Sequence, residues 1–317
     1  MNGQRKVLIC PLDWGLGHAS RCIPIIHDQL SKGNLVYLAS NGRAKEYLKG
    51  YFPELTFLPD PPAYAVRYST WLPLMVKLAL QTPRLLSVIR RENQWLQSMI
   101  EQYAIDTVIS DNRYGLYSNK ANCILITHQT APLFPTAVKS LFHRKMYKWY
   151  HRFSAVHIPD ELQTEHSLGF DLSHKNVPEN AVYIGFLSRF FTCIDETVNL
   201  QYAIVALVSG PEPERSRRED ALKKQILRNG RKAILLRGIP DAGALVFENG
   251  HWSEGAYPND DQLSAMLRGC ESIISGCGYS SLMDMRILGV MDKVQWYATP
   301  GQTEQEYLYK IHNKSRL

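Results

Sequence analysis

The chain has 317 residues, of which 45% are hydrophobic, and 36 lysines and arginines against 30 acidic residues give a formal net charge of +6. This length exceeds one ordinary doubly wound unit and predicts two domains. Six scattered cysteines without a C-x-x-C pair are typical of free thiols in a reducing cytoplasm. No signal peptide and no membrane span of roughly 20 apolar residues are predicted. The charge excess is mild and no nucleic-acid signature accompanies it, so we expect a cytoplasmic protein that does not bind nucleic acid.

The first part of the chain alternates short apolar strands with helices. A strand at Lys6–Cys10 ends at a glycine loop, helical spacing follows from Ala19 to Leu30, and Leu35–Ser40 forms the next strand. This order predicts a βαβ unit with a parallel sheet. In chain order, the pattern then predicts a strand near residue 56, a helix over 71–103 interrupted by a proline at 83, strands at 107–111 and 123–128, a helix over 136–153, and strands at 155–159 and 181–185.

The strand–loop–helix pattern restarts near residue 202, after a polar connector. Its predicted strands lie at 202–208, 232–238, 244–249, 272–275 and 293–297, and its clearest helix covers 260–269. We therefore expect an α/β protein of two Rossmann-like domains, residues 1–196 and 197–317, that face each other across a cleft. The second domain is the shorter one, and we expect it to be truncated at its C-terminal helices.

The stretch SGCGYSSLMD, Ser275 to Asp284, follows an apolar strand. Gly276 and Gly278 permit close approach of a ligand, and Ser280 or Ser281 can cap a helix whose first amides bind an anion. Asp284 lies one turn into that helix, where its carboxylate can accept from a ribose hydroxyl. A plain glycine turn with a serine cap fits the same letters.

A second polar loop, TPGQTEQ, follows the next predicted strand and reaches the same edge of the sheet. Gln302, Glu304 and Gln305 offer amide and carboxylate groups suited to sugar hydroxyls. A polar turn capped by Thr303 is the alternative interpretation.

The first domain opens with PLDWGLGHASR directly after its first strand. Gly15 and Gly17 permit a tight turn that brings His18 to a helix start above the sheet edge. Asp111 ends the strand TVISD at the same edge and can orient the His18 imidazole, although an ordinary turn residue also suits its position. His128 ends LITH and is a candidate for acceptor contact, with the same alternative.

These motifs carry a resemblance to the GT-B glycosyltransferases, closest to glycosyltransferase family 28. That family includes the enzyme that adds N-acetylglucosamine to the lipid-linked peptidoglycan precursor, and diacylglycerol sugar transferases. GLGHASR resembles its N-terminal glycine-histidine loop, GCGYSSLMD its C-terminal donor loop, and PGQTEQ the loop that contacts the donor sugar. The three matches occur in both halves, in the family's order.

The resemblance implies transfer of a hexose or N-acetylhexosamine from a nucleoside-diphosphate sugar, expected to be UDP-linked, to an acceptor hydroxyl. Gly276, Cys277, Gly278, Ser280 and Ser281 would bind the diphosphate, Asp284 the ribose, and Gln302, Glu304 and Gln305 the hexose. His18 would act as the base or orient the acceptor, beside Gly15 and Gly17.

Two departures from the family pattern affect the donor loops. Gly276 stands where a related donor motif has a phosphate-binding histidine. The loop at Gly210 reads SGPEPERSR, and its two prolines lack the backbone N–H groups of a glycine-rich loop. Arg215 is the candidate to compensate for those missing donors.

Glycosyl transfer requires a stabilised leaving diphosphate and a deprotonated acceptor hydroxyl. A helix N-terminus supplies the first without a metal, and the acidic run at 259–261 suits a helix cap, so we expect no metal cofactor. Two basic aromatic segments, residues 70–91 and 142–153, suit either an anionic membrane surface near a lipid-linked acceptor or helices packed on the sheet. A nucleotide-sugar 2-epimerase and a non-catalytic binding subunit remain alternatives.

Overall fold

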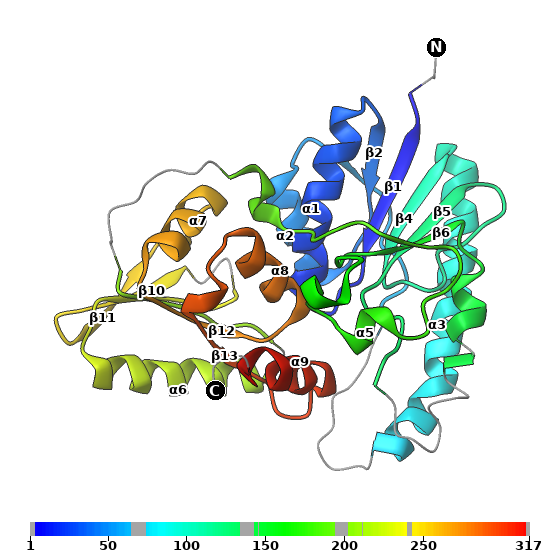
Figure 1. Cartoon of the computed structure of the whole chain (residues 1–317). Coiled ribbons are helices and arrows are strands. Elements are labelled where there is room, and N and C mark those ends of the chain that lie inside the picture. Colours follow the sequence, from blue (N-terminus) through cyan, green and yellow to red (C-terminus); the bar gives the residue numbers. More distant parts are fainter. Residues whose placement is uncertain are drawn as a thin grey trace. The chain divides into compact units, whose positions relative to one another are not determined.

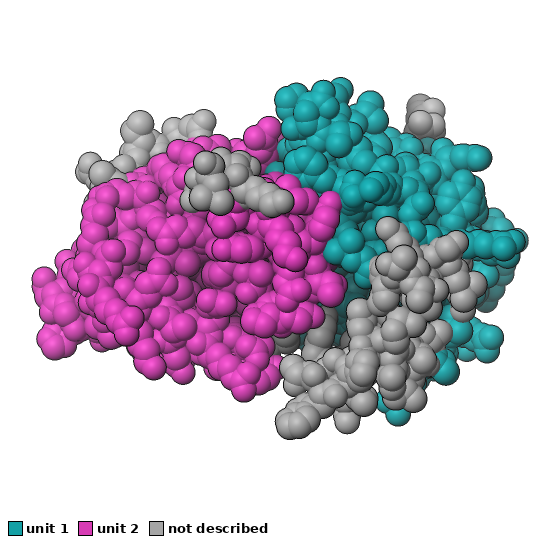
Figure 2. All heavy atoms as spheres, turned by 60° about the horizontal axis from the view of Figure 1, so that its bottom comes forward, with its two compact units in different colours: residues 1–187 teal, residues 188–317 magenta. Residues whose placement is uncertain are grey.

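The protein is described by a computed structural model that covers residues 4–64, 74–133, 143–144, 146–193, 202–210, 212–239 and 243–314. The chain divides into two compact units, Met1–Leu187 and Ser188–Leu317 (Figure 2). The expected domain boundary followed residue 196. Residues after 187 count with the second unit because the short helix η2 (Arg189–Thr192) packs against the second unit's helices α7 (Asp260–Gly269) and α8 (Tyr279–Ile287).

The first unit is built on a parallel sheet of seven strands in the order β3-β2-β1-β4-β5-β6-β7 (Figure 1). The change of direction at β1 and β4 gives the doubly wound arrangement that the sequence predicts. The strands are β1 (Lys6–Pro11), β2 (Leu35–Leu38), β3 (Thr56–Phe57), β4 (Thr107–Asp111), β5 (Asn122–Ile126), β6 (Ala155–Ile158) and β7 (Ala181–Tyr183).

Strand β1 shows why this sheet is covered on both sides. Successive side chains of a strand point to opposite faces. Val7 and Ile9 join the core cluster that includes residues of α1 and α2, whereas Leu8 and Cys10 join the cluster that includes residues of α3. The helices of this unit with assigned bounds are α1 (Leu16–Ser31), α2 (Gly42–Tyr51), α3 (Leu74–Tyr103), η1 (Thr164–His166) and α5 (Asp171–His174). The described residues 143–144 and 146–150, within the predicted helix 136–153, are also helical.

Helix α3 differs from its prediction because it continues through Pro83 over 30 residues. A proline removes one intrahelical hydrogen bond. The later turns of α3 bury Val88, Ile89, Leu96 and Ile100, and this burial keeps the helix in place beyond the proline. The prediction of an interruption at Pro83 was therefore wrong.

The second unit has a sheet of six strands in the order β11-β10-β9-β8-β12-β13. Strands β9, β8, β12 and β13 run parallel, whereas β10 is antiparallel to both neighbours. The turn between β10 and β11 is Asn249-Gly250, both with positive φ, which suits a tight hairpin. The strands are β8 (Ile204–Leu207), β9 (Ala233–Leu236), β10 (Ala244–Glu248), β11 (His251–Gly255), β12 (Ser272–Gly276) and β13 (Val294–Tyr297).

The helices of the second unit, besides η2, follow the parallel strands β8, β12 and β13 or the antiparallel hairpin of β10 and β11. They are α6 (Glu214–Asn229), α7, α8, η4 (Met291–Lys293) and α9 (Thr303–Lys314). Helix α7 starts at the predicted cap, where Asn259 and Gln262 form a reciprocal capping box. Two parallel-dominated sheets with helices confirm the predicted α/β class. All six cysteines lie in the described residues and are unpaired, as predicted.

Candidate active site

His18 lies in the first turn of α1, at the carboxyl edge of the first unit's sheet. Gly15 precedes the helix with a φ of 100°, a conformation that residues with a Cβ rarely adopt. The glycine therefore allows the chain to turn from β1 into α1 within a few residues. Gly17 follows in the same helical turn, and the His18 side chain is 17% exposed.

Asp111, the last residue of β4, meets His18 at this edge. Its Oδ2 atom lies 3.1 Å from Nδ1 of His18, so the predicted contact is present. The carboxylate is fully buried. Strands β4 and β1 pair in parallel, with Asp111 opposite Pro11. The carboxyl ends of both strands therefore reach the same edge of the sheet, and Asp111 is held there.

Arg21 is a third member of this group that the sequence patterns did not single out. It lies one turn after His18 on α1 and is only 2% exposed. Its Nε donates to Asp111 Oδ2 over 2.7 Å, and its Nη2 donates to Asp111 Oδ1. The same Nη2 lies 2.8 Å from Nδ1 of His18. The guanidinium thus binds the carboxylate with two bonds and also contacts the imidazole.

His128 completes the group from the loop after β5. Its Nδ1 lies 3.3 Å from Arg21 Nη1, and its ring is 3% exposed. The structure therefore brings together His18, Asp111 and His128, and Arg21 contacts all three. We call these four residues the edge network.

Burial and neighbouring charges shift the pKa values of His18 and Asp111. Burial and the Arg21 guanidinium lower the pKa of His18, and Asp111 opposes them in part. Burial alone would raise the pKa of Asp111, but Arg21 and His18 lower it to about 2. Asp111 is therefore ionised and His18 neutral near pH 7. Among the described residues, none hydrogen-bonds to Nε2 of His18.

A buried ion pair supports the loop that carries His18. Glu92 accepts from Arg113 Nε over 2.6 Å and from the Tyr64 hydroxyl over 2.5 Å. The Trp14 indole N–H donates to the Tyr64 carbonyl, 2.9 Å away, and 41% of Trp14 stays exposed. Trp14 is thus an exposed aromatic side chain that is held in place four residues before His18.

Three loops of the second unit lie together at the carboxyl ends of β8, β12 and β13. A Cβ added to Gly276 would lie 3.4 Å from Ser209 Oγ, and one added to Gly210 would lie 3.9 Å from Thr299 Oγ1. A Cβ added to Gly278 would lie 3.9 Å from Gln305 Nε2. We call this arrangement the three-loop edge. It unites the predicted donor motifs because their strands are parallel neighbours.

Helix α8 starts at this edge, earlier than its predicted caps. Its N-cap is Gly278, and Ser280 and Ser281 occupy the first turn, so neither serine is the cap. Both serines are half-buried. Glycine at this position leaves the backbone next to the first helical amides accessible to an anion.

Cys277 and Arg215 differ from their predicted roles. The Cys277 thiol is fully buried, and its backbone N–H donates to the Tyr297 carbonyl over 2.8 Å, so neither group is available as a phosphate donor. Arg215 is buried and binds Glu212 and Glu219 through its guanidinium. It therefore does not replace the donors that the proline-containing loop lacks.

Asp284 projects from the second turn of α8 and is half-buried. The Ser188 hydroxyl donates to its Oδ1 over 2.6 Å. Burial raises the pKa of Asp284 to about 6, although Arg189 and the bond from Ser188 lower it in part. One carboxylate oxygen is thus already bonded to the segment that follows the first unit.

The loop from Thr299 to Gln305 is closed by its own side chains. Gln305 Oε1 accepts from the Thr299 N–H over 3.0 Å, which holds the Gln305 side chain against its own loop. Glu306 Oε1 accepts from the Gly301 N–H over 2.9 Å. Glu304 lies near Cys277, whose pKa is raised to about 12 by burial and then by this carboxylate. Gln302 is half-buried in the same loop.

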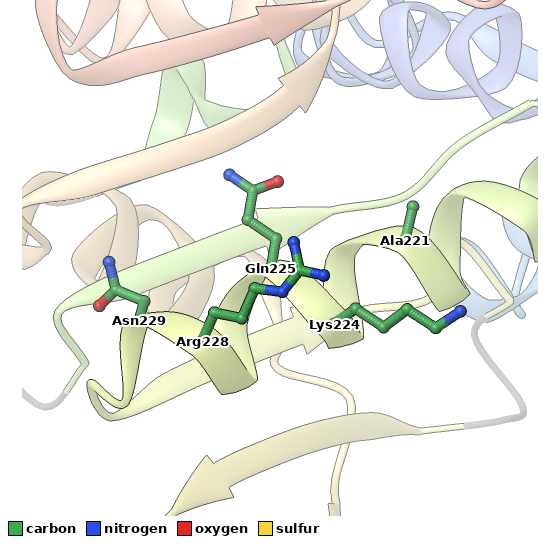
Figure 3. A pocket seen from close by; sticks show the side chains of 5 residues that line it. All are labelled: Ala221, Lys224, Gln225, Arg228 and Asn229. Carbon is green, nitrogen blue, oxygen red and sulfur yellow. The ribbon is translucent and has the colours of Figure 1, made fainter.

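A hollow of about 710 Å³ lies elsewhere, along the outer face of α6 (Figure 3). Its walls are Ala221, Lys224, Gln225, Arg228 and Asn229, all from that one helix. These residues form the later turns of α6, which lead to the start of β9 and away from the three-loop edge. The hollow contains no glycine loop and no buried titratable group, so it is not the candidate site.

Within the described ranges, no group of three or more histidine, cysteine or acidic side chains is arranged to hold a metal ion. None of the described helices is both long and apolar enough to cross a bilayer. The membrane-surface prediction for residues 70–91 and 142–153 falls partly outside the described residues. In the described part of the second segment, Tyr150 and Trp149 pack against the core, whereas Arg144 and Lys148 are exposed.

Solved structures with a similar fold are glycosyltransferases. SsfS6 from Streptomyces sp. SF2575, complexed with thymidine diphosphate, has a TM-score of 0.57 and 12% identity, over 97% of this chain and 86% of that one. UGT89C1 from Arabidopsis thaliana, complexed with UDP-L-rhamnose, has a TM-score of 0.56 and 12% identity, over 100% of this chain and 84% of that one. SnogD from Streptomyces nogalater has a TM-score of 0.54 and 13% identity, over 99% and 96%.

No family profile matches the chain, and no curated protein matches it in sequence. At such low identity the structural likeness shows the fold alone, which is the GT-B fold that the motifs resemble. The predicted membership of family 28 stays a prediction.

Four residues to which the sequence analysis gave no role at the site also contribute to it. Arg21, Ser188, Ser209 and Thr299 all contact predicted site residues or lie beside them. The first lies within the motif GLGHASR and could have been identified from its helical spacing to His18. Ser209 and Thr299 begin the loops SGPEPERSR and TPGQTEQ, whereas Ser188 carries no local signal, because only chain packing brings it to Asp284.

Proposed function

We propose that this protein is a nucleotide-sugar glycosyltransferase that moves a hexosyl or N-acetylhexosaminyl group from a nucleoside-diphosphate sugar to an acceptor hydroxyl. The observation that carries the proposal is the three-loop edge, because it gathers glycine backbone, the start of α8 and two serines at one place. This combination suits a diphosphate. The GT-B fold around it is shared with glycosyltransferases whose solved structures contain nucleotides.

The donor binds at the three-loop edge in this proposal. The positive end of the α8 dipole and the Ser280 and Ser281 hydroxyls face the diphosphate. Asp284 accepts from the ribose hydroxyls with the oxygen that Ser188 does not bond. The Gln305 amide nitrogen and the Glu304 carboxylate contact the sugar, with Gln302 beside them.

The reaction breaks the bond between the anomeric carbon and the diphosphate oxygen, and the leaving diphosphate takes the electron pair. The acceptor oxygen forms the new bond to the anomeric carbon and loses its proton. His18 contacts this hydroxyl through Nε2, either to take the proton or to orient the oxygen. When its hydrogen is on Nδ1 and donated to Asp111, Nε2 carries the lone pair that proton removal requires. Charge on the diphosphate is stabilised without a metal ion.

The first experiment is a thermal-shift screen with UDP, dTDP, GDP and ADP on wild-type protein, Gly278→Val and Asp284→Ala. A bound nucleotide at about 100 times its Kd stabilises the folded state by about 2.7 kcal/mol. We expect a shift with at least one nucleotide in the wild-type protein and none in either variant. Full stabilisation of Gly278→Val would exclude the three-loop edge as the donor site.

The second experiment follows the sugar itself. The protein is incubated with radiolabelled UDP-glucose, UDP-N-acetylglucosamine or dTDP-rhamnose, with and without simple sugar and lipid acceptors. Acceptor-dependent release of the nucleoside diphosphate supports transfer, and its persistence in EDTA supports metal independence. Formation of a 2-epimer without acceptor would identify an epimerase and overturn the transferase proposal.

We extend the proposal to an acceptor at an anionic membrane surface. Exposed basic side chains on α3 and on the segment before β6 suit such a surface: Arg84, Arg90, Arg91, Arg144 and Lys148. Sedimentation with vesicles that contain phosphatidylglycerol, compared with neutral vesicles, tests this extension. Equal recovery with both vesicle types would remove the membrane from the proposal and leave the donor site unaffected.

A further inference from the structure

Arg21 occupies the centre of the edge network, although neither the motifs nor the proposed reaction assigns it a role. It is almost fully buried and lies within hydrogen-bond distance of Asp111, His18 and His128. A guanidinium can donate but not accept, and it stays charged. Two of its hydrogen bonds go to the two oxygens of the Asp111 carboxylate. The charge of Asp111 is therefore balanced by Arg21 and does not require a protonated His18.

We propose that Arg21 is a positioning residue that neutralises Asp111, so that His18 remains an uncharged imidazole anchored through Nδ1 with Nε2 left to meet the acceptor. The inference rests on the proposed function of His18. It explains why a histidine beside a buried carboxylate does not become a permanent imidazolium. A histidine–carboxylate pair without the arginine would favour the protonated ring.

The charged and titratable groups that face His18 come from three elements. They are Arg21 of α1 itself, Asp111 at the end of β4 and His128 after β5. Nδ1 of His18 lies 2.8 Å from the Arg21 donor and 3.1 Å from the Asp111 acceptor. With either hydrogen arrangement, Nδ1 is held within the network, and the ring cannot turn without losing that contact.

The test measures the titration of His18 directly by NMR, independently of any enzyme activity. The chain has 10 histidines, and the His18 signal is assigned by its loss in His18→Gln. In Arg21→Met, the midpoint of the His18 titration should move to higher pH by roughly one pH unit, because Asp111 then faces the imidazole alone. In Asp111→Asn, the midpoint should move to lower pH, because the arginine charge is no longer balanced.

The double variant Arg21→Met with Asp111→Asn removes both charges and serves as the matched control. Its midpoint should return towards the wild-type value, and it should lie above that of Asp111→Asn alone. Arg21→Lys keeps the positive charge but loses the planar guanidinium that binds the carboxylate with two bonds. Its His18 midpoint should therefore lie closer to the wild-type value than that of Arg21→Met. If Arg21→Met does not fold, the comparison of Asp111→Asn with the double variant decides the question. Equal midpoints in those two proteins would overturn the proposal.

Activity then separates this inference from the proposed function. Where transfer is measurable, the acidic limb of kcat/KM should move with the His18 midpoint in the same variants. A moved midpoint with no transfer from any nucleotide sugar would leave Arg21's role intact and refute the transferase. Measurable transfer with an unmoved His18 midpoint would support the transferase and refute the role proposed for Arg21.

Discussion

The two sheet edges hold their polar groups in different ways. In the first unit, charged side chains from α1, β4 and the loop after β5 bond to one another in a buried edge network. In the second unit, the edge is made of glycines, serines and backbone, and Arg215, which follows one of its loops, is bonded to glutamates instead. In the function proposed above, the first arrangement controls a proton, whereas the second binds an anion at the start of a helix. The difference predicts separable effects of mutations in the two units.

The largest effect is expected from breaking the ion pair of the edge network. Asp111→Ala leaves the buried Arg21 guanidinium without its carboxylate, which destabilises the fold by about 3–5 kcal/mol. Urea unfolding of the wild-type and variant proteins measures the loss. Adding Arg21→Met to the variant should restore most of it, and a double variant as unstable as Asp111→Ala would show that the pair is not the cause.

A change at His18 should affect chemistry with little effect on stability. His18→Gln is expected to lower kcat of the transfer reaction by about 100-fold or more, because a general base or orienting group contributes roughly that much. Its melting temperature should stay within a few degrees of wild type, because the side chain is partly exposed and Arg21 still pairs with Asp111. Unchanged kcat would remove His18 from the reaction.

A substitution in the three-loop edge should remove nucleotide binding and leave the fold intact, in contrast to the loss of stability expected for Asp111→Ala. An added Cβ at Gly278 meets no atom closer than 3.9 Å, so Gly278→Val should fold and unfold like the wild-type protein. It should nevertheless lose nucleotide binding, because the side chain covers the start of α8. Isothermal titration calorimetry measures the binding. Gly50→Val, on an exposed glycine of α2 with open space around it, is the control and should bind normally.

Asp284 should show a pH effect of smaller size. Its folded-state pKa of about 6 lies above the ordinary value, so the folded state is favoured by protonation at low pH and loses that advantage as pH rises through 6. Asp284→Asn should therefore match the wild-type protein near about pH 4 and exceed it by on the order of 2 kcal/mol at about pH 8. Urea unfolding at several pH values measures the difference. A difference that does not change with pH would contradict the raised pKa.

Local sequence patterns were sufficient to predict the alternation of strands and helices and the positions of the glycine loops. Parallel strands bring their carboxyl ends to one edge, so the loops after β12 and β13 could be grouped from the strand pattern alone. Asn259 was also predictable, because a capping box involves residues only three positions apart. Asn-Gly is a typical sequence for a tight hairpin turn. The sequence analysis nevertheless predicted only the strand before Asn249-Gly250 and did not predict β11 after it.

Tertiary packing decided the remaining properties. Cys277 lies within a donor-like motif, yet strand pairing uses its amide and the core covers its thiol. Arg215 was a plausible phosphate ligand until the fold placed two glutamates beside it. The central place of Arg21 depends on three elements that are distant in sequence, and burial gives their charges the strength to set the state of His18. The sequence by itself determined which residues reach the sheet edges, because that depends on local periodicity and turns. Only the tertiary structure determined which of them remain available to a ligand, because desolvation and competing partners are properties of the packed chain.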